Sequence, residues 1–135
     1  MSELARKLIQ DVNDEQAAAL AAIEAGIGQI EEAEALAATL RSFGVPEARA
    51  SGYVSSGKYT AKGGYVSGWV QALFTSADVL IQALRDADLQ VSHINIKGSD
   101  AVGHIHLRGL ECTLCADAAA CTAVAMHRPT EPAHG

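Results

Sequence analysis

The chain has 135 residues, of which 49% are hydrophobic, and this fits one globular domain that buries about two thirds of its unfolded surface. Its formal net charge of −6 argues against a general nucleic-acid or anionic-membrane binder, because both need a basic surface. No apolar run approaches the roughly 18 residues that cross a bilayer, and no export signal is visible. Three cysteines fit poorly with a disulfide framework, so a cytoplasmic protein is expected.

A long amphipathic helix is expected over about residues 3–43. Asn13 or Asp14 can accept backbone amides at a helix start, and Gly44 with Pro46 provides the end. Apolar residues recur along it at steps of three and four, which is the helical period. This stripe consists of Ile9, Val12, Ala19, Leu20, Ile23, Ile27, Ile30, Ala33, Ala37 and Leu40.

This helix is too long for its own domain to cover. Thirty helical residues extend about 45 Å, whereas a compact domain of this length is about 37 Å across. Two outcomes remain open: Gly26 and Gly28 break the helix into two antiparallel pieces, or the stripe pairs with a second chain. Pairing is preferred, and the protein is therefore expected to be a homodimer held by a coiled coil.

Residues 48–67 are rich in Gly, Ser and Tyr and predict a flexible hairpin or loop, with Gly63-Gly64 as a turn. Basic side chains gather in and before this segment, whereas eight of the 16 acids lie in residues 3–34. An acidic helix beside a basic loop predicts charge complementarity within or between copies. The candidate partner-binding residues of the loop are Lys58, Tyr59 and Lys62.

The remaining elements complete a single α+β domain over residues 1–128. YVSGWVQALF predicts a buried strand, and Thr75 followed by Asp78 predicts a helix start. A hairpin follows from Leu89, and the Ala content of CTLCADAAACTAVAMH favours a last helix. The expected order is α-β-β-α-β-β-α, with a small antiparallel sheet and helices packed on one of its faces. A disordered tail is expected over residues 129–135.

The stretch from His93 to Arg108 predicts a hairpin with one apolar and one polar face. A tight turn at Ser99-Asp100 sets a register in which Ile96 faces Gly103, Ile94 faces Ile105 and His93 faces His106. The apolar face then consists of Ile94, Ile96, Ile105 and Leu107. The polar face carries His93, Asn95, Lys97, His104, His106 and Arg108. A register one residue off would bury histidines beside isoleucines, so the register is well specified.

This polar face is the main functional candidate, and three interpretations of it stay open. His93, His104 and His106 could ligate one Zn²⁺, which resembles the three-histidine site of zinc lyases of the carbonic anhydrase type. The same histidines could instead bind an anion or phosphate together with Arg108. The preferred interpretation is a solvated or partner-contacting face, with Asn95, Lys97 and Arg108 as its contact residues.

The cysteines allow three interpretations. Cys112, Cys115 and Cys121 could form a zinc site with His127, or Cys112 and Cys115 could form a redox dithiol. The preferred interpretation is that the three cysteines serve as small buried apolar residues.

These features predict a binding or regulatory protein more than an enzyme. It would act as a homodimer and dock on a larger protein as an accessory or inhibitory factor. The alternative from another class is a zinc-dependent enzyme or zinc-binding protein that uses the hairpin histidines. No cofactor other than zinc is expected, and neither is a membrane or nucleic-acid partner.

Overall fold

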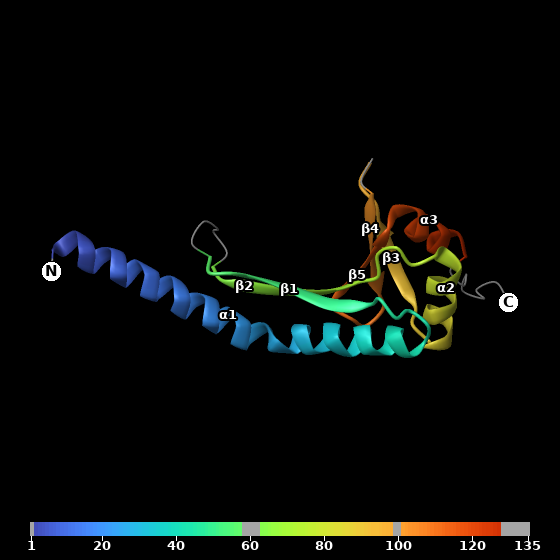
Figure 1. Cartoon of the computed structure of the whole chain (residues 1–135), viewed down its shortest axis with the longest axis horizontal. Helices are drawn as coiled ribbons and strands as arrows, with labels where there is room; N and C mark the ends of the chain where they lie inside the picture. Colours follow the sequence, from blue (N-terminus) through green and yellow to red (C-terminus); the bar gives the residue numbers. More distant parts are fainter. Residues whose placement is uncertain (1, 58–62, 99–100, 128–135) are drawn as a thin grey trace.

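The computed structural model describes residues 2–57, 63–98 and 101–127, and it has an α+β fold, as expected. A long helix lies along a two-stranded hairpin, and its N-terminal end projects beyond that hairpin (Figure 1). The other strands and the two short helices lie toward the opposite end of the molecule. The elements are α1 (Glu3–Ser42), β1 (Arg49–Ser55), β2 (Tyr65–Gln71), α2 (Ala77–Asp86), β3 (Val91–Asn95), β4 (Val102–Leu107), β5 (Thr113–Asp117) and α3 (Ala118–His127).

Helix α1 is one continuous helix of 40 residues, about 60 Å long. It begins at Glu3, as the expected range of about 3–43 has it, and the alternative cap at Asn13 or Asp14 is wrong, because the Ser2 hydroxyl accepts the Ala5 N–H at 3.1 Å and no Gly or Pro interrupts the first turns. The predicted end is confirmed: Gly44 has a φ of +101°, and the following N–H of Val45 donates to the Leu40 carbonyl at 2.9 Å.

The two glycines inside α1 do not break the helix, and they differ from each other. A Cβ built on Gly26 would collide with the Cγ1 atom of Val66 on β2, whereas a Cβ on Gly28 would meet nothing within 4 Å. Gly26 therefore lets β2 approach the helix closely, and Gly28 has no such packing role.

Alanine at these two positions should have opposite effects on stability. Gly28→Ala should stabilise the protein by up to about 1 kcal/mol, because Ala is the better helix former. Gly26→Ala should destabilise it, since the cost of overpacking, about 1–3 kcal/mol, exceeds that gain. Urea unfolding of both variants should separate them by about 2 kcal/mol. Equal unfolding midpoints would contradict the close packing of β2 on α1.

The sheet is mixed, so the predicted all-antiparallel sheet is wrong. Its strand order is β1-β2-β5-β4-β3, and β2 pairs with β5 in parallel while the other neighbours are antiparallel. The extra strand β5 comes from the segment predicted to be wholly helical. In it Leu114 and Ala116 are fully buried and alternate with half-buried residues, which is the period of a strand. Pairing with β2 and β4, which joins two hairpins into one sheet, outweighs the helix propensity of Ala there.

Helices α1 and α3 cover the same face of this sheet. The register places Gly68, Val70, Leu114 and Ile105 on one face. A Cβ at Gly68 would meet Ile30 of α1 at 3.1 Å, and a Cβ at Gly103 would meet the Cys121 sulfur of α3 at 2.8 Å. The hydrophobic core therefore lies between this face and the helices.

Helix α2 packs on α3, and its Leu80, Ala83 and Leu84 are buried in the core. Its cap is Ser76, one residue after the predicted Thr75, and its hydroxyl accepts the Val79 N–H at 3.3 Å. Across the three described ranges, no helix has an apolar stretch long enough to cross a membrane.

Candidate binding face of the sheet

The predicted register of the β3–β4 hairpin is confirmed in its described part. His93 pairs with His106, Ile94 with Ile105, and Asn95 with His104. A Cβ at Gly103 would lie 2.9 Å from Ile96, which agrees with the expected pairing beyond the strand. The turn predicted at Ser99-Asp100 lies outside the described residues.

The apolar side of the hairpin is buried unevenly. Ile105 and Leu107 of β4 are buried, whereas Ile94 and Ile96 are only half-buried. The difference follows from topology, because β4 lies between two strands while β3 is the edge of the sheet.

The opposite side of the whole sheet carries no buried residue along its strands and is called here the uncovered face. The register continues the histidine side of the hairpin across β5 to β2 and β1. Its members are Arg49, Ser51, Tyr53, Ser55, Tyr65, Ser67, Trp69, Gln71, His93, Asn95, Val102, His104, His106, Thr113, Cys115 and Asp117. Each is exposed or half-buried, in contrast with the helix-covered side.

Histidines form the most distinctive group on the uncovered face. The rings of His93 and His106 stack with centroids 4.0 Å apart and planes at 12°. His104 is two residues from His106 on β4. The pKa of His106 is lowered, first because burial penalises the charged ring and then because His93 and His104 add positive charge when protonated. These residues therefore form one electrostatically coupled cluster.

The zinc interpretation gains no support from this arrangement. Among the residues that the structure describes, no group of three or more His, Cys, Asp or Glu side chains is placed to hold a metal ion. The zinc site at His93, His104 and His106 stays a hypothesis for metal analysis to decide.

The lowered pKa of His106 predicts that stability falls as the pH drops below about 6.5, the ordinary value for histidine in an unfolded chain. Below that pH the unfolded chain takes up a proton that the folded ring still resists, so protonation favours unfolding. Stability stops falling once the pH is below the pKa of His106 in the folded protein. Urea midpoints between about pH 8 and about pH 5.5 should decline less steeply for His106→Asn than for the wild type. Parallel profiles would contradict the lowered pKa of His106.

The other candidate contact residues have different environments. Asn95 and Lys97 are exposed. Arg108 is engaged with Gln90, whose side-chain oxygen accepts from the guanidinium at 3.2 Å and whose carbonyl accepts the Arg108 N–H at 2.7 Å. The loop candidates Lys58, Tyr59 and Lys62 lie outside the described residues.

The cysteines do not form a reactive group. Cys112 precedes β5 and is buried, Cys115 is on the uncovered face, and Cys121 is buried in α3. Burial and the neighbouring Glu32 carboxylate raise the pKa of Cys112 to about 12, and burial also raises the pKa values of Cys115 and Cys121. Thiols that stay protonated are poor nucleophiles and poor metal ligands, which supports the apolar interpretation.

Sequence patterns missed two features that join distant segments. One Glu32 oxygen accepts the N–H groups of Glu111 and Cys112 at 2.7 and 2.8 Å, which ties α1 to the start of β5. The other feature is a cavity between α2, α3 and the start of β3. Neither leaves a local sequence signal, because the partners of each come from separate parts of the chain.

No protein-family model, curated protein or solved structure compared with this chain matches it. Its fold and uncovered face define an α+β protein with a projecting helix and an open, polar sheet surface.

Proposed function

We propose that this chain is a non-enzymatic binding protein that dimerises through α1 and presents its uncovered face to a larger partner protein. The observation that carries the proposal is the number of large apolar side chains left exposed on α1. They are Leu4, Leu8, Ile9, Val12, Leu20, Ile23 and Ile27. Large apolar side chains left exposed in such number on one element of a monomer mark an interaction site.

The spacing of these residues favours a helical partner. Leu20, Ile23 and Ile27 are 62%, 39% and 52% exposed and follow steps of three and four, as in a coiled-coil seam. Their side of α1 lies next to the side that packs on the sheet, whose buried members are Ala22, Ala33, Leu36, Ala37 and Leu40. A second α1 helix would cover the exposed stripe without displacing the sheet.

Aromatic residues support a partner-binding role for the uncovered face. Tyr53 and Tyr65 are exposed, their ring centroids are 6.1 Å apart, and the half-buried Trp69 follows on β2. Tyr and Trp are enriched in protein interfaces, where they contribute large contact areas. The face thus combines aromatic groups at its β1–β2 side with histidines at its β3–β4 side.

Light scattering of the purified protein tests the dimer. At micromolar concentrations the mass should be about twice the 14.0 kDa of one chain. A mass of one chain at all concentrations up to about 100 µM would contradict the proposal.

A zinc protein is the second candidate, because the register places His93, His104 and His106 on one face of the hairpin, although their side chains are not placed to hold a metal ion. Elemental analysis of untagged protein, purified without chelators, distinguishes the two functions. About one zinc per chain would favour the zinc protein. A metal-free preparation would favour contact or proton-linked roles for the histidines.

A further inference from the structure

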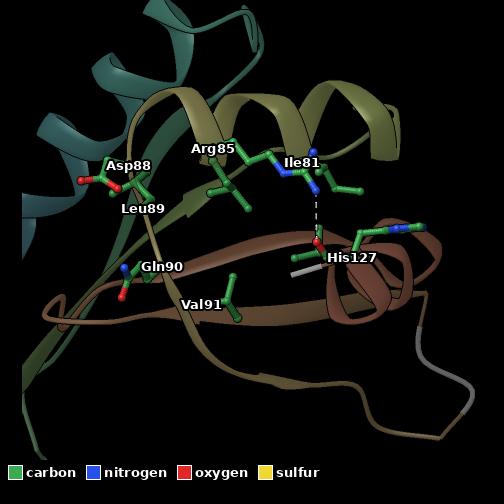
Figure 2. A pocket seen from close by; sticks show the side chains of 9 residues that line it. Ile81, Arg85, Asp88, Leu89, Gln90, Val91 and His127 are labelled. Carbon is green, nitrogen blue, oxygen red and sulfur yellow. Dashed lines mark hydrogen bonds between the residues drawn. The ribbon is translucent and has the colours of Figure 1, made fainter. Parts of the chain in front are cut away.

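A cavity of about 170 Å³ lies between α2, α3 and the segment that leads into β3 (Figure 2). Its walls are apolar and come from Ile81, Leu84, Leu89, Val91 and Val124. Leu84 and Val124 are buried, and the other three are half-buried. It lies away from the exposed stripe of α1, so its occupation does not depend on the proposed dimer.

One cation reaches across this cavity. The Arg85 side chain extends from α2 toward α3, where its Nη2 donates to the His127 carbonyl at a long 3.4 Å (Figure 2). Within the described ranges, no carboxylate forms an ion pair with its guanidinium. The Asp88 carboxylate and the His127 ring belong to the rim, and both point away from the centre of the cavity (Figure 2).

We propose that this cavity binds a small apolar monocarboxylate, with its aromatic or hydrocarbon body between the helices and its carboxylate on Arg85. The guanidinium fork matches a carboxylate, so the exposed Arg85 side chain can pair with the ligand's carboxylate while the ligand's body is held between the helices. A cavity of about 150 Å³ holds a benzene ring, so this one suits a ligand body of about one six-membered ring, with the carboxylate on Arg85. Asp88 at the rim favours a singly charged ligand over a dianion such as phosphate.

Titration of the full chain with benzoate, followed by amide NMR shifts, tests this proposal. Benzoate should shift signals of α2 and α3 with a Kd on the order of 1 mM or tighter, as expected for a ligand of this size. Benzyl alcohol, which has a similar body but no charge, should bind at least about ten-fold more weakly. Shifts that are absent at about 20 mM benzoate, or equal affinity for the alcohol, would overturn the proposal.

Two arginine variants separate recognition by Arg85 from general charge. Arg85→Met keeps an unbranched, flexible side chain but removes the guanidinium, and it should weaken benzoate binding at least about ten-fold. Arg49→Met is the matched control, because Arg49 lies on β1, where its Nε donates to Gln71. It should bind benzoate like the wild type. Equal Kd values for the two variants would overturn the role of Arg85.

A third variant tests the location and guards against misfolding. Ile81→Phe enlarges a half-buried wall residue and should block benzoate while leaving the circular dichroism spectrum unchanged. If Arg85→Met is unfolded, Ile81→Phe alone decides. If a folded Ile81→Phe protein bound benzoate as tightly as the wild type, benzoate would bind outside this cavity and the proposal would be overturned.

Discussion

Replacing Ile105 with alanine should lower the free energy of unfolding by about 2–5 kcal/mol, the range for a large aliphatic residue lost from a core. Ile105 is fully buried at the middle of β4, where it pairs with Leu114 of β5 and Ile94 of β3. The helices and the neighbouring strands cannot fill the space left by the Ile105 side chain without losing other contacts. That space should therefore remain as a cavity in the core. Urea unfolding measures this loss directly.

The histidines of the same strand provide the matched control. His104 and His106 alternate with Ile105 but lie on the uncovered face. The double variant His104→Ala with His106→Ala should cost under about 1 kcal/mol, because His104 is exposed, His106 is half-buried, and substitutions outside the core rarely cost more. If the histidine variant were as destabilising as Ile105→Ala, the assignment of the two faces would be wrong.

Ile23→Asp combined with Ile27→Asp should weaken the proposed dimer by about a thousand-fold or more, because each copy would bury two unpaired charges in the seam. Both residues are exposed in the single chain, so the fold itself should survive. Ile30 is not suitable for this test, because its Cδ1 lies at the backbone of Gly52 and Gly68. Light scattering should then report one chain mass, with an unchanged circular dichroism spectrum.

The control for the seam variant is Ala17→Asp combined with Ala21→Asp. These positions have the same spacing of four residues and are also exposed, but they lie on another side of α1. The repulsion between two aspartates one turn apart is therefore the same in both proteins. The control should remain a dimer. Dissociation of both variants alike would show that added charge, and not the apolar stripe, controls association.

Local periodicity determined most of the elements and the candidate face. Steps of three and four predicted α1, and Gly44 predicted its end. Alternation along the hairpin predicted that His93 faces His106, because only one register separates its histidines from its isoleucines. These predictions succeeded because each depends on residues close in the chain or joined by one turn.

Only the tertiary structure decided the features that join distant segments. Residues 113–117 form a strand because β2 and β4 flank them, a context that outweighs the helix preference of their neighbouring alanines. Gly26 leaves room for Val66 of β2 to pack against α1. Arg85 of α2 donates a hydrogen bond to the His127 carbonyl of α3 across a cavity. The sequence by itself determined which residues share a face, since side-chain direction follows the backbone period. Which faces meet, and which stay uncovered, depended on packing between elements far apart in the chain.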